Sequence, residues 1–154
     1  MRVLDRTDRA IVSLLQKNAR RSNKELAGAI GIAPSTCSER VHRLEQDGIL
    51  VGSHAEVDPR ALGIGLRALV AIRLTRHAAS EVARFRDHAL AMPEVIGWSH
   101  VTGANDFLVH VVVRDADHLR QLAVTGFTSL PEVAHIETSL VFEHVAKQGL
   151  PDLL

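Results

Sequence analysis

Residues 22–49 constrain the fold most strongly, because their pattern is that of two short helices joined by a tight turn. Ser22 and Glu25 have the spacing of a capping box, which satisfies the free backbone amides at the start of a helix. Gly31 tolerates the positive backbone angle that ends a helix, and Pro34 suits the first position of the next one. The spacing therefore predicts two helices separated by only a few residues.

The second of these helices has an apolar side and a polar side. Cys37, Val41 and Leu44 recur at steps of four and three residues, so we expect them to form one buried stripe. The opposite side carries groups that donate to phosphates and guanine edges, and a carboxylate that accepts from cytosine. The candidate DNA-binding residues on this side and its flank are Ser35, Thr36, Glu39, Arg40, His42 and Arg43.

A preceding amphipathic helix favours the DNA-binding interpretation over an ordinary capped helix pair. Exposed Ser, Thr and Arg are common on solvent-facing helices, so the turn and the stripe alone leave both interpretations open. Residues 5–18 place Ile11, Leu14 and Leu15 on one side of a further helix. Together the three helices have the outline of a helix-turn-helix domain, which ends near Gly48.

Basic and acidic residues are divided unevenly along a chain that is neutral as a whole. Residues 1–55 contain nine Lys and Arg against six Asp and Glu, a net charge of +3, whereas residues 56–154 contain nine against twelve, a net charge of −3. A difference of a few charges also arises by chance, so this asymmetry adds little by itself. DNA binding by one modestly basic module is expected to be weak and sensitive to salt.

Length and composition exclude several classes of protein. With 154 residues, 46% of them hydrophobic, the chain is long enough to form two small domains with cores. No segment approaches the roughly 20 apolar residues that cross a bilayer, so we expect a cytoplasmic protein without a membrane partner. The single cysteine, Cys37, has no internal disulfide partner and lies on the predicted buried stripe, which favours a packing role.

Metal, cofactor and catalytic sites are not indicated by the sequence. The nine histidines show no H-E-x-x-H or comparable ligand spacing. No Ser-His-Asp, paired-carboxylate or phosphate-loop pattern stands out either. We therefore expect neither an enzyme nor a protein with a resident metal or cofactor.

The second half of the chain alternates between strand and helix patterns. Residues 51–62 are polar and extended and end in a turn, which we interpret as a linker. Residue alternation and helix breakers beyond this linker predict elements in the order βαββαβ. The strands are expected at residues 66–75, 95–101, 107–113 and 133–142, and the helices at residues 80–91 and between Asp115 and Pro131.

These elements predict an α+β protein with two domains. Residues 1–50 form the winged-helix-like helix-turn-helix domain, residues 51–62 the linker strand and turn, and residues 63–154 a ferredoxin-like domain. Both helices of the ferredoxin-like domain are expected on one face of a four-stranded antiparallel sheet. Leu69 and Ala71 fall on its other face, so we expect that face to be covered by self-association.

Several short motifs occur together in this chain. They are Leu4-Asp5-Arg6-Thr7-Asp8, Gly31-Ile32-Ala33-Pro34-Ser35-Thr36-Cys37, Arg40-Val41, Arg43-Leu44-Glu45, Gly48-Ile49 and, at the predicted middle hairpin, Gly103-Ala104-Asn105-Asp106. Combined with the βαββαβ domain, they make the chain similar to the Lrp/AsnC (leucine-responsive and asparagine-responsive) feast/famine transcription regulators over essentially its whole length. One departure is Ala33, which stands where a capping Ser or Asp is typical of the family.

The resemblance implies a sequence-specific DNA-binding transcriptional regulator that forms a homodimer and assembles further, usually into an octamer. It also implies a small-molecule effector, an amino acid or related metabolite, bound in clefts between the C-terminal domains. The two recognition helices of a dimer are expected to meet half-sites about one helical turn apart on double-stranded DNA.

The resemblance also implies candidate residues for the effector site. The turn at residues 102–106 offers backbone amides for a carboxylate and an acidic side chain for an ammonium group. Gly, Asn and Asp equally favour hairpin turns without any ligand, and a tryptophan suits packing at an interface. The residues carried over from the family are Trp98, Thr102, Gly103, Asn105 and Asp106, together with Thr138 and Ser139, which match contacts from a neighbouring subunit.

Two other functions are compatible with the sequence. An architectural DNA-compacting protein of the same fold would bind DNA without responding to a metabolite. An amino-acid-binding module that regulates an enzyme by contact would lack DNA binding, and the basic three-helix domain argues against it. The sequence does not identify the effector, the direction of regulation or the target genes.

Overall fold

Residues 3–76, 78–146 and 149–153 are described by the structure, a computed structural model of the 154-residue chain. The chain divides into two units, residues 1–56 with 145–154 and residues 57–144. Residues 145–154 therefore group with the N-terminal helices, whereas the sequence pattern assigns residues 63–154 to one domain.

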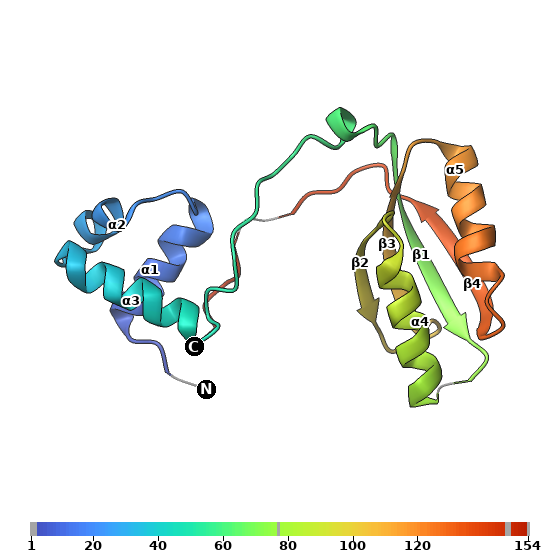
Figure 1. The fold of residues 1–154 in the computed structure, drawn as a ribbon, viewed down its shortest axis with the longest axis horizontal. Helices are drawn as coiled ribbons and strands as arrows, with labels where there is room; N and C mark the ends of the chain where they lie inside the picture. The colour runs from blue at the N-terminus through green and yellow to red at the C-terminus, as the bar shows by residue number, and fades with distance from the viewer. Residues whose placement is uncertain (1–2, 77, 147–148, 154) are drawn as a thin grey trace. The chain divides into compact units, whose positions relative to one another are not determined.

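Three helices form the N-terminal unit (Figure 1). They are α1 (Arg6–Lys17), α2 (Asn23–Ile30) and α3 (Pro34–Gln46). Asp5 caps α1, since its side chain accepts a hydrogen bond from the Asp8 N–H at 2.8 Å. The predicted capping box of α2 is confirmed, because Ser22 and Glu25 each accept a hydrogen bond from the other's backbone N–H.

The turn between α2 and α3 follows from residues that the sequence places there. Gly31 adopts φ of 81°, in the left-handed region, and its N–H donates to the Ala27 carbonyl at 2.8 Å. Ala33 occupies the capping position of α3 and makes no side-chain hydrogen bond to the helix. Pro34 then takes the first helical position, where its missing N–H costs nothing. The predicted helix-turn-helix is confirmed.

A small apolar core holds the three helices together. Cys37 and Leu44 of α3 are fully buried, which confirms the predicted stripe. Burial raises the pKa of the Cys37 thiol, so the group stays protonated near neutral pH and packs as a small apolar side chain. The other buried apolar residues of this core are Ile11, Leu26 and Ala27.

The C-terminal segment contacts α1. Arg9 forms an ion pair with Asp152, with a nitrogen-to-oxygen distance of 3.3 Å. The Leu150 N–H donates a hydrogen bond to the Gln16 side-chain oxygen. These contacts explain why the segment belongs to the N-terminal unit, although the sequence contains no periodicity that indicates it.

The second unit contains the sheet and its helices. Their bounds are η1 (Pro59–Leu62), β1 (Leu66–Leu74), α4 (Ala79–Ala91), β2 (Val95–His100), β3 (Phe107–Val113), α5 (Ala116–Gln121), the π-helical segment η2 (Leu122–Thr128) and β4 (Val133–Leu140). The strand order is β2-β3-β1-β4, and every neighbouring pair is antiparallel. The predicted ferredoxin-like βαββαβ arrangement is confirmed.

The helices of this unit pack on one face of the sheet (Figure 1). Phe85 of α4 stacks on Phe107 of β3 with ring centroids 4.9 Å apart, and Phe127 of η2 lies beside Phe85 at 6.5 Å. Val70 and Val109, paired across β1 and β3, are fully buried beneath them. Leu69 and Ala71 are the alternate residues of β1 and lie on the opposite face, as predicted.

Most elements of this unit begin and end within one residue of the sequence prediction, and two differ more. The last strand ends at Leu140, which pairs with Ala68, rather than at residue 142, although the Val141 N–H still donates to the Arg67 carbonyl of β1 at 2.9 Å. The second helix of the unit changes to π-helical form at Leu122. Residues five apart lie near one another in a π-helix, so Leu122 and Phe127 both reach the core.

We expect Gly31→Ala to destabilise the N-terminal unit by about 1 kcal/mol, since alanine in the left-handed region is strained. Gly28→Ala is the matched control, because Gly28 lies within α2 and an added Cβ meets nothing within 4 Å. Gly28→Ala should therefore stabilise by about 0.5–1 kcal/mol. Urea unfolding of the three proteins measures both shifts. Equal effects of the two changes would contradict the assignment of Gly31 as the turn residue.

Candidate functional site

The solvent-facing side of α3 carries most of the predicted DNA-binding residues. Ser35, Thr36 and Glu39 are exposed along the first half of the helix. His42 has its Nε2 3.0 Å from the Gln46 side-chain nitrogen, and Arg43 keeps 43% of its side chain accessible. The helix thus presents hydroxyls, a carboxylate, an imidazole and a guanidinium to solvent, which suits contact with base edges and phosphates.

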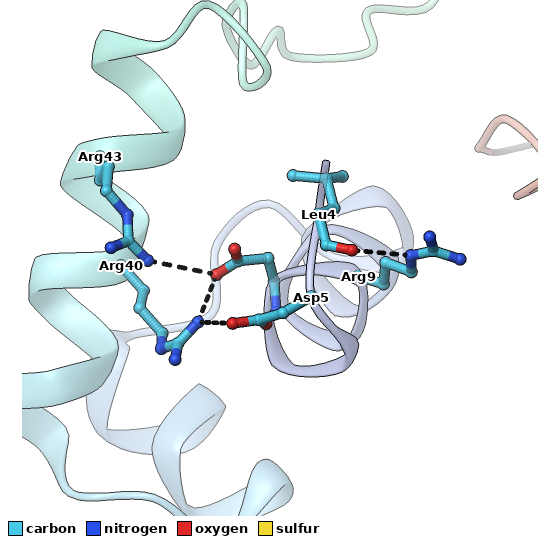
Figure 2. A network of polar contacts seen from close by, with 6 residues as sticks. Leu4, Asp5, Arg9, Arg40 and Arg43 are labelled. Carbon is cyan, nitrogen blue, oxygen red and sulfur yellow. Dashed lines mark hydrogen bonds and ion pairs between the residues drawn. The ribbon is translucent and has the colours of Figure 1, made fainter. Parts of the chain in front are cut away.

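Arg40 is placed differently from the other predicted residues. Its Nη1 donates to the Asp5 carboxylate at 2.6 Å and to the Asp8 carboxylate at 2.7 Å (Figure 2). Arg43 lies further from Asp8, with 3.7 Å between its Nη2 and the carboxylate oxygen. The guanidinium of Arg40 therefore joins α3 to the start of α1, and its role as a DNA contact stays a prediction.

Asp5 and Asp8 were not singled out as functional residues by the sequence pattern. Asp8 is fully buried, although acidic residues at the start of a helix are usually exposed. The sequence does contain an indication that Asp8 is buried. Asp8 precedes Ile11 by three residues and Leu15 by seven, so it lies on the apolar stripe of α1. A carboxylate on a buried stripe requires a partner, and Arg40 supplies a close one.

The ion pairs shift the pKa values of Asp5 and Arg40. The hydrogen bond from Arg40, followed by the backbone hydrogen bond from Asp8, holds the pKa of Asp5 below its ordinary value. The hydrogen bond to Asp5, followed by the one to Asp8, raises the pKa of Arg40. Asp5 and Arg40 are therefore both charged near neutral pH.

The predicted effector turn between β2 and β3 is held against the end of β1. Gly103 has φ of 123°, and both Thr102 and Gly103 are exposed. The Asp106 carboxylate accepts a hydrogen bond from the Leu74 N–H at 2.7 Å, and the Asp106 N–H donates to the Ile72 carbonyl at 2.8 Å. Asp106 thus makes the backbone contacts that are expected of a turn residue even without a ligand. An effector role for Asp106 and for the half-buried Asn105 stays a prediction.

Trp98 lies on the helix-covered side of β2. Its ring stacks on Phe107 with centroids 5.1 Å apart and lies 6.2 Å from the His100 ring. The indole Nε1 is buried and has no hydrogen-bond partner in the described part of the chain. Trp98 is therefore a packing residue in this structure, and an apolar wall of an effector site is compatible with that role.

Thr138 and Ser139 point to opposite faces of the sheet. Thr138 pairs with Val70, whose side chain is in the core, and Ser139 pairs with Leu69 on the other face. Their strand, β4, and the strand of Trp98, β2, are the two edges of the sheet. Three strand spacings separate the edges, about 14 Å, so one copy of the domain does not bring Ser139 and Trp98 together.

Metal ligands and membrane-spanning helices are both missing from residues 3–76, 78–146 and 149–153. Within these ranges, no three His, Cys, Asp or Glu side chains are grouped so that they could hold a metal ion. No helix in the same ranges is long and apolar enough to cross a membrane.

Comparison with known protein families accounts for both units. Residues 4–45 match the AsnC-type helix-turn-helix domain, and residues 67–151 match the Lrp/AsnC ligand binding domain. The chain belongs to the Lrp/AsnC family. All the motifs that indicated this family except Gly48-Ile49 lie within the two matched segments, and the predicted membership is confirmed.

Relatives within the Lrp/AsnC family match the chain along most of its length. The HTH-type transcriptional regulator AldR of Mycolicibacterium smegmatis is 39% identical over 144 residues, which are 94% of this chain and 84% of the relative. The leucine-responsive regulatory protein of Escherichia coli is 36% identical over 146 residues, which are 95% of this chain and 89% of the relative. These relatives are transcriptional regulators rather than enzymes.

Solved structures of the family have the same fold. An AsnC family transcriptional regulator from Agrobacterium tumefaciens superposes with a TM-score of 0.88 at 26% identity, covering 96% of this chain and 97% of that one. A transcriptional regulator from Neisseria meningitidis, in complex with L-Met, gives a TM-score of 0.86 at 28% identity, covering 97% of each chain. The predicted fold and the predicted class, a DNA-binding transcriptional regulator with a ligand-binding domain, are confirmed.

We expect Asp5→Asn to lower the thermal stability of the N-terminal unit in a pH-dependent way. Because the folded-state pKa is depressed, the stabilisation is complete above the ordinary value of 3.8 and is lost as the pH falls through the folded-state pKa. Unfolding midpoints of wild type and variant should therefore differ at neutral pH and converge once the pH falls below the depressed folded-state pKa of Asp5. A difference that stays constant over this range would show that the carboxylate charge is not responsible.

Proposed function

We propose that the protein binds double-stranded DNA through the exposed side of α3 in two copies of the chain. The exposed Ser35, Thr36 and Glu39, together with the partly exposed Arg43, support this proposal. A two-fold dimer would present two such helices to half-sites about one helical turn apart, so the operator would be pseudopalindromic. Because DNA is the partner, we place the protein in the cytoplasm.

The observation that carries self-association is the placement of the candidate effector residues. Trp98 and Ser139 lie on strands at opposite edges of the sheet, so a site that uses both has to be completed by another copy. The sheet face opposite the helices carries Leu69 and Ala71 of β1 and Leu108 of β3, which an adjoining copy would cover. We propose a homodimer that assembles further, with the octamer as the favoured state.

The proposed effector is an amino acid or a related metabolite. The L-Met complex of the Neisseria meningitidis relative supports this class of ligand. In this chain, the exposed backbone at Thr102 and Gly103 would donate to a carboxylate, and Asp106 would attract an ammonium group. Contacts from β4 of a second copy, through Thr138 or Ser139, would complete the site.

A genome-fragment binding selection tests the function as a whole. The purified full-length protein is mixed with fragments at physiological salt, with and without a mixture of the common amino acids. We expect selective enrichment of fragments with spaced, related half-sites, and a change in that enrichment when amino acids are added. Unselective retention would favour an architectural DNA-compacting role, and no retention would favour a module without DNA binding.

The charge of Asp106 is expected to matter for the effector but little for the fold. Asp106→Asn keeps an oxygen that accepts from the Leu74 N–H and removes the negative charge that an ammonium group would need. We therefore expect the amino-acid response of DNA binding to weaken at least tenfold in effector concentration, about 1.4 kcal/mol. The thermal midpoint should change little.

Asp117→Asn is the matched control for this change, because the Asp117 side chain is 94% exposed at the start of α5. It removes one negative charge from the same unit without touching the turn. A normal response in Asp106→Asn, or an equal loss in both variants, would leave Asp106 as a turn residue only.

A further inference from the structure

The two arginines of α3, Arg40 and Arg43, are held unequally by the acidic residues of α1. We propose that Asp5 and Asp8 are specificity-determining residues, which keep Arg40 inside the protein and leave Arg43 as the arginine of α3 that reaches DNA phosphate. The inference rests on the proposed DNA binding and goes beyond it, because it separates two arginines that the sequence treats alike.

Arg40 forms short ion pairs with both acidic residues. A single nitrogen, Nη1, donates to one carboxylate oxygen of Asp5 at 2.6 Å and one of Asp8 at 2.7 Å (Figure 2). The other carboxylate oxygen of Asp5 is already used to cap α1. Only 24% of the Arg40 side chain is exposed. Arg40 is thus fixed from two sides by groups that are themselves fixed.

Release of Arg40 toward a phosphate would be costly. Asp8 has no solvent exposure, so it depends on protein groups to balance its charge. Arg43 is 3.7 Å from Asp8, beyond the length of a good hydrogen bond, and so does not replace Arg40. Loss of a close charged partner from a buried carboxylate strongly destabilises the folded protein. The stable arrangement therefore keeps Arg40 on α1 when DNA approaches.

Arg43 is the better placed of the two for DNA. Its side chain is 43% exposed, and its ion pair with Asp8 is the longer of the two arginine contacts to that carboxylate. Its Nε is buried and has no hydrogen-bond partner in the described part of the chain, so the exposed remainder of the side chain is what DNA would meet. Figure 2 shows its guanidinium turned toward the carboxylates that bind Arg40, with the longer contact to Asp8 marked by a dashed line. A phosphate oxygen would compete with Asp8 for this guanidinium, because the 3.7 Å contact is weaker than the two short contacts of Arg40.

This division of roles affects selectivity. A phosphate contact strengthens binding to every sequence, since phosphates repeat along any duplex. With Arg40 held, α3 adds one arginine rather than two to this sequence-independent binding, while Ser35, Thr36 and Glu39 remain exposed to read bases. The acidic residues therefore limit nonspecific affinity and increase the ratio of specific to nonspecific binding.

The experiment measures binding of the full-length chain to a random-sequence duplex and to a fragment selected by the wild type, between about 50 and 200 mM salt. In Asp5→Asn, Arg40 loses one of its two charged partners. We expect higher affinity for the random duplex and a lower ratio of specific to random binding. The salt slope should become steeper by about 0.9 per protomer for each additional phosphate that is neutralised. Adding the isosteric Asp8→Asn should enlarge these changes.

Two further variants show whether the effect acts through Arg40. Asp5→Asn combined with Arg40→Gln should return the salt slope to the wild-type value. Glu45→Gln is the matched control, because it removes one carboxylate from α3 itself, where the Glu45 side chain is 58% exposed and faces His42. If the effect came only from the loss of a negative charge, Asp5→Asn and Glu45→Gln would change the salt slope equally.

The outcomes separate this inference from the proposed function. An unchanged slope in Asp5→Asn, an equal change in Glu45→Gln, or a steeper slope that persists with Arg40→Gln overturns the inference while wild-type binding stands. If the wild type binds neither duplex, the proposed DNA binding itself fails. Asp5 is half-exposed, so Asp5→Asn keeps the test available even if the buried Asp8→Asn does not fold.

Discussion

The buried carboxylate of Asp8 is the constraint on which the N-terminal unit depends. A charged group without solvent exposure has to be balanced within the protein, and Arg40 of α3 contributes to that balance at 2.7 Å. The apolar core of this unit is small, and apolar contacts are not directional. The ion pair is directional, so it fixes which side of α3 faces α1, which apolar packing alone does not. The solvent-facing side of α3 is thereby fixed as well.

Much of the N-terminal unit could be predicted because its signals are local. The capping box of Ser22 and Glu25 and the left-handed Gly31 depend on residues only a few positions apart, and sequence spacing records such relations directly. The placement of Arg40 could not be predicted this way, since its partners lie 32 and 35 residues earlier. The periodicity of apolar residues distinguishes the buried and exposed sides of α3. It does not identify the partners of Arg40, which lies between these two sides.

The second unit shows a similar limit. Alternating apolar residues predicted the four strands and their succession along the chain, because a two-residue period is a strong signal in a half-covered sheet. The π-helical segment at Leu122 depends on how two distant side chains fit the core, which no local pattern records. For the effector site, family likeness carried over Thr138 and Ser139 together. Strand geometry instead turns adjacent residues to opposite faces, so the two contribute to different surfaces.

The position of Trp98 makes it an intrinsic fluorescence probe of the sheet unit. It is the single tryptophan of the chain, and its indole is stacked on Phe107 within the sheet unit. Intrinsic tryptophan fluorescence therefore originates entirely in the ligand-binding half of the molecule, while α3 contributes no such signal. Rearrangement around β2 and β3 changes the emission of this one indole. Events in the sheet unit can thus be followed in an unmodified sample without interference from tryptophan in the DNA-binding half.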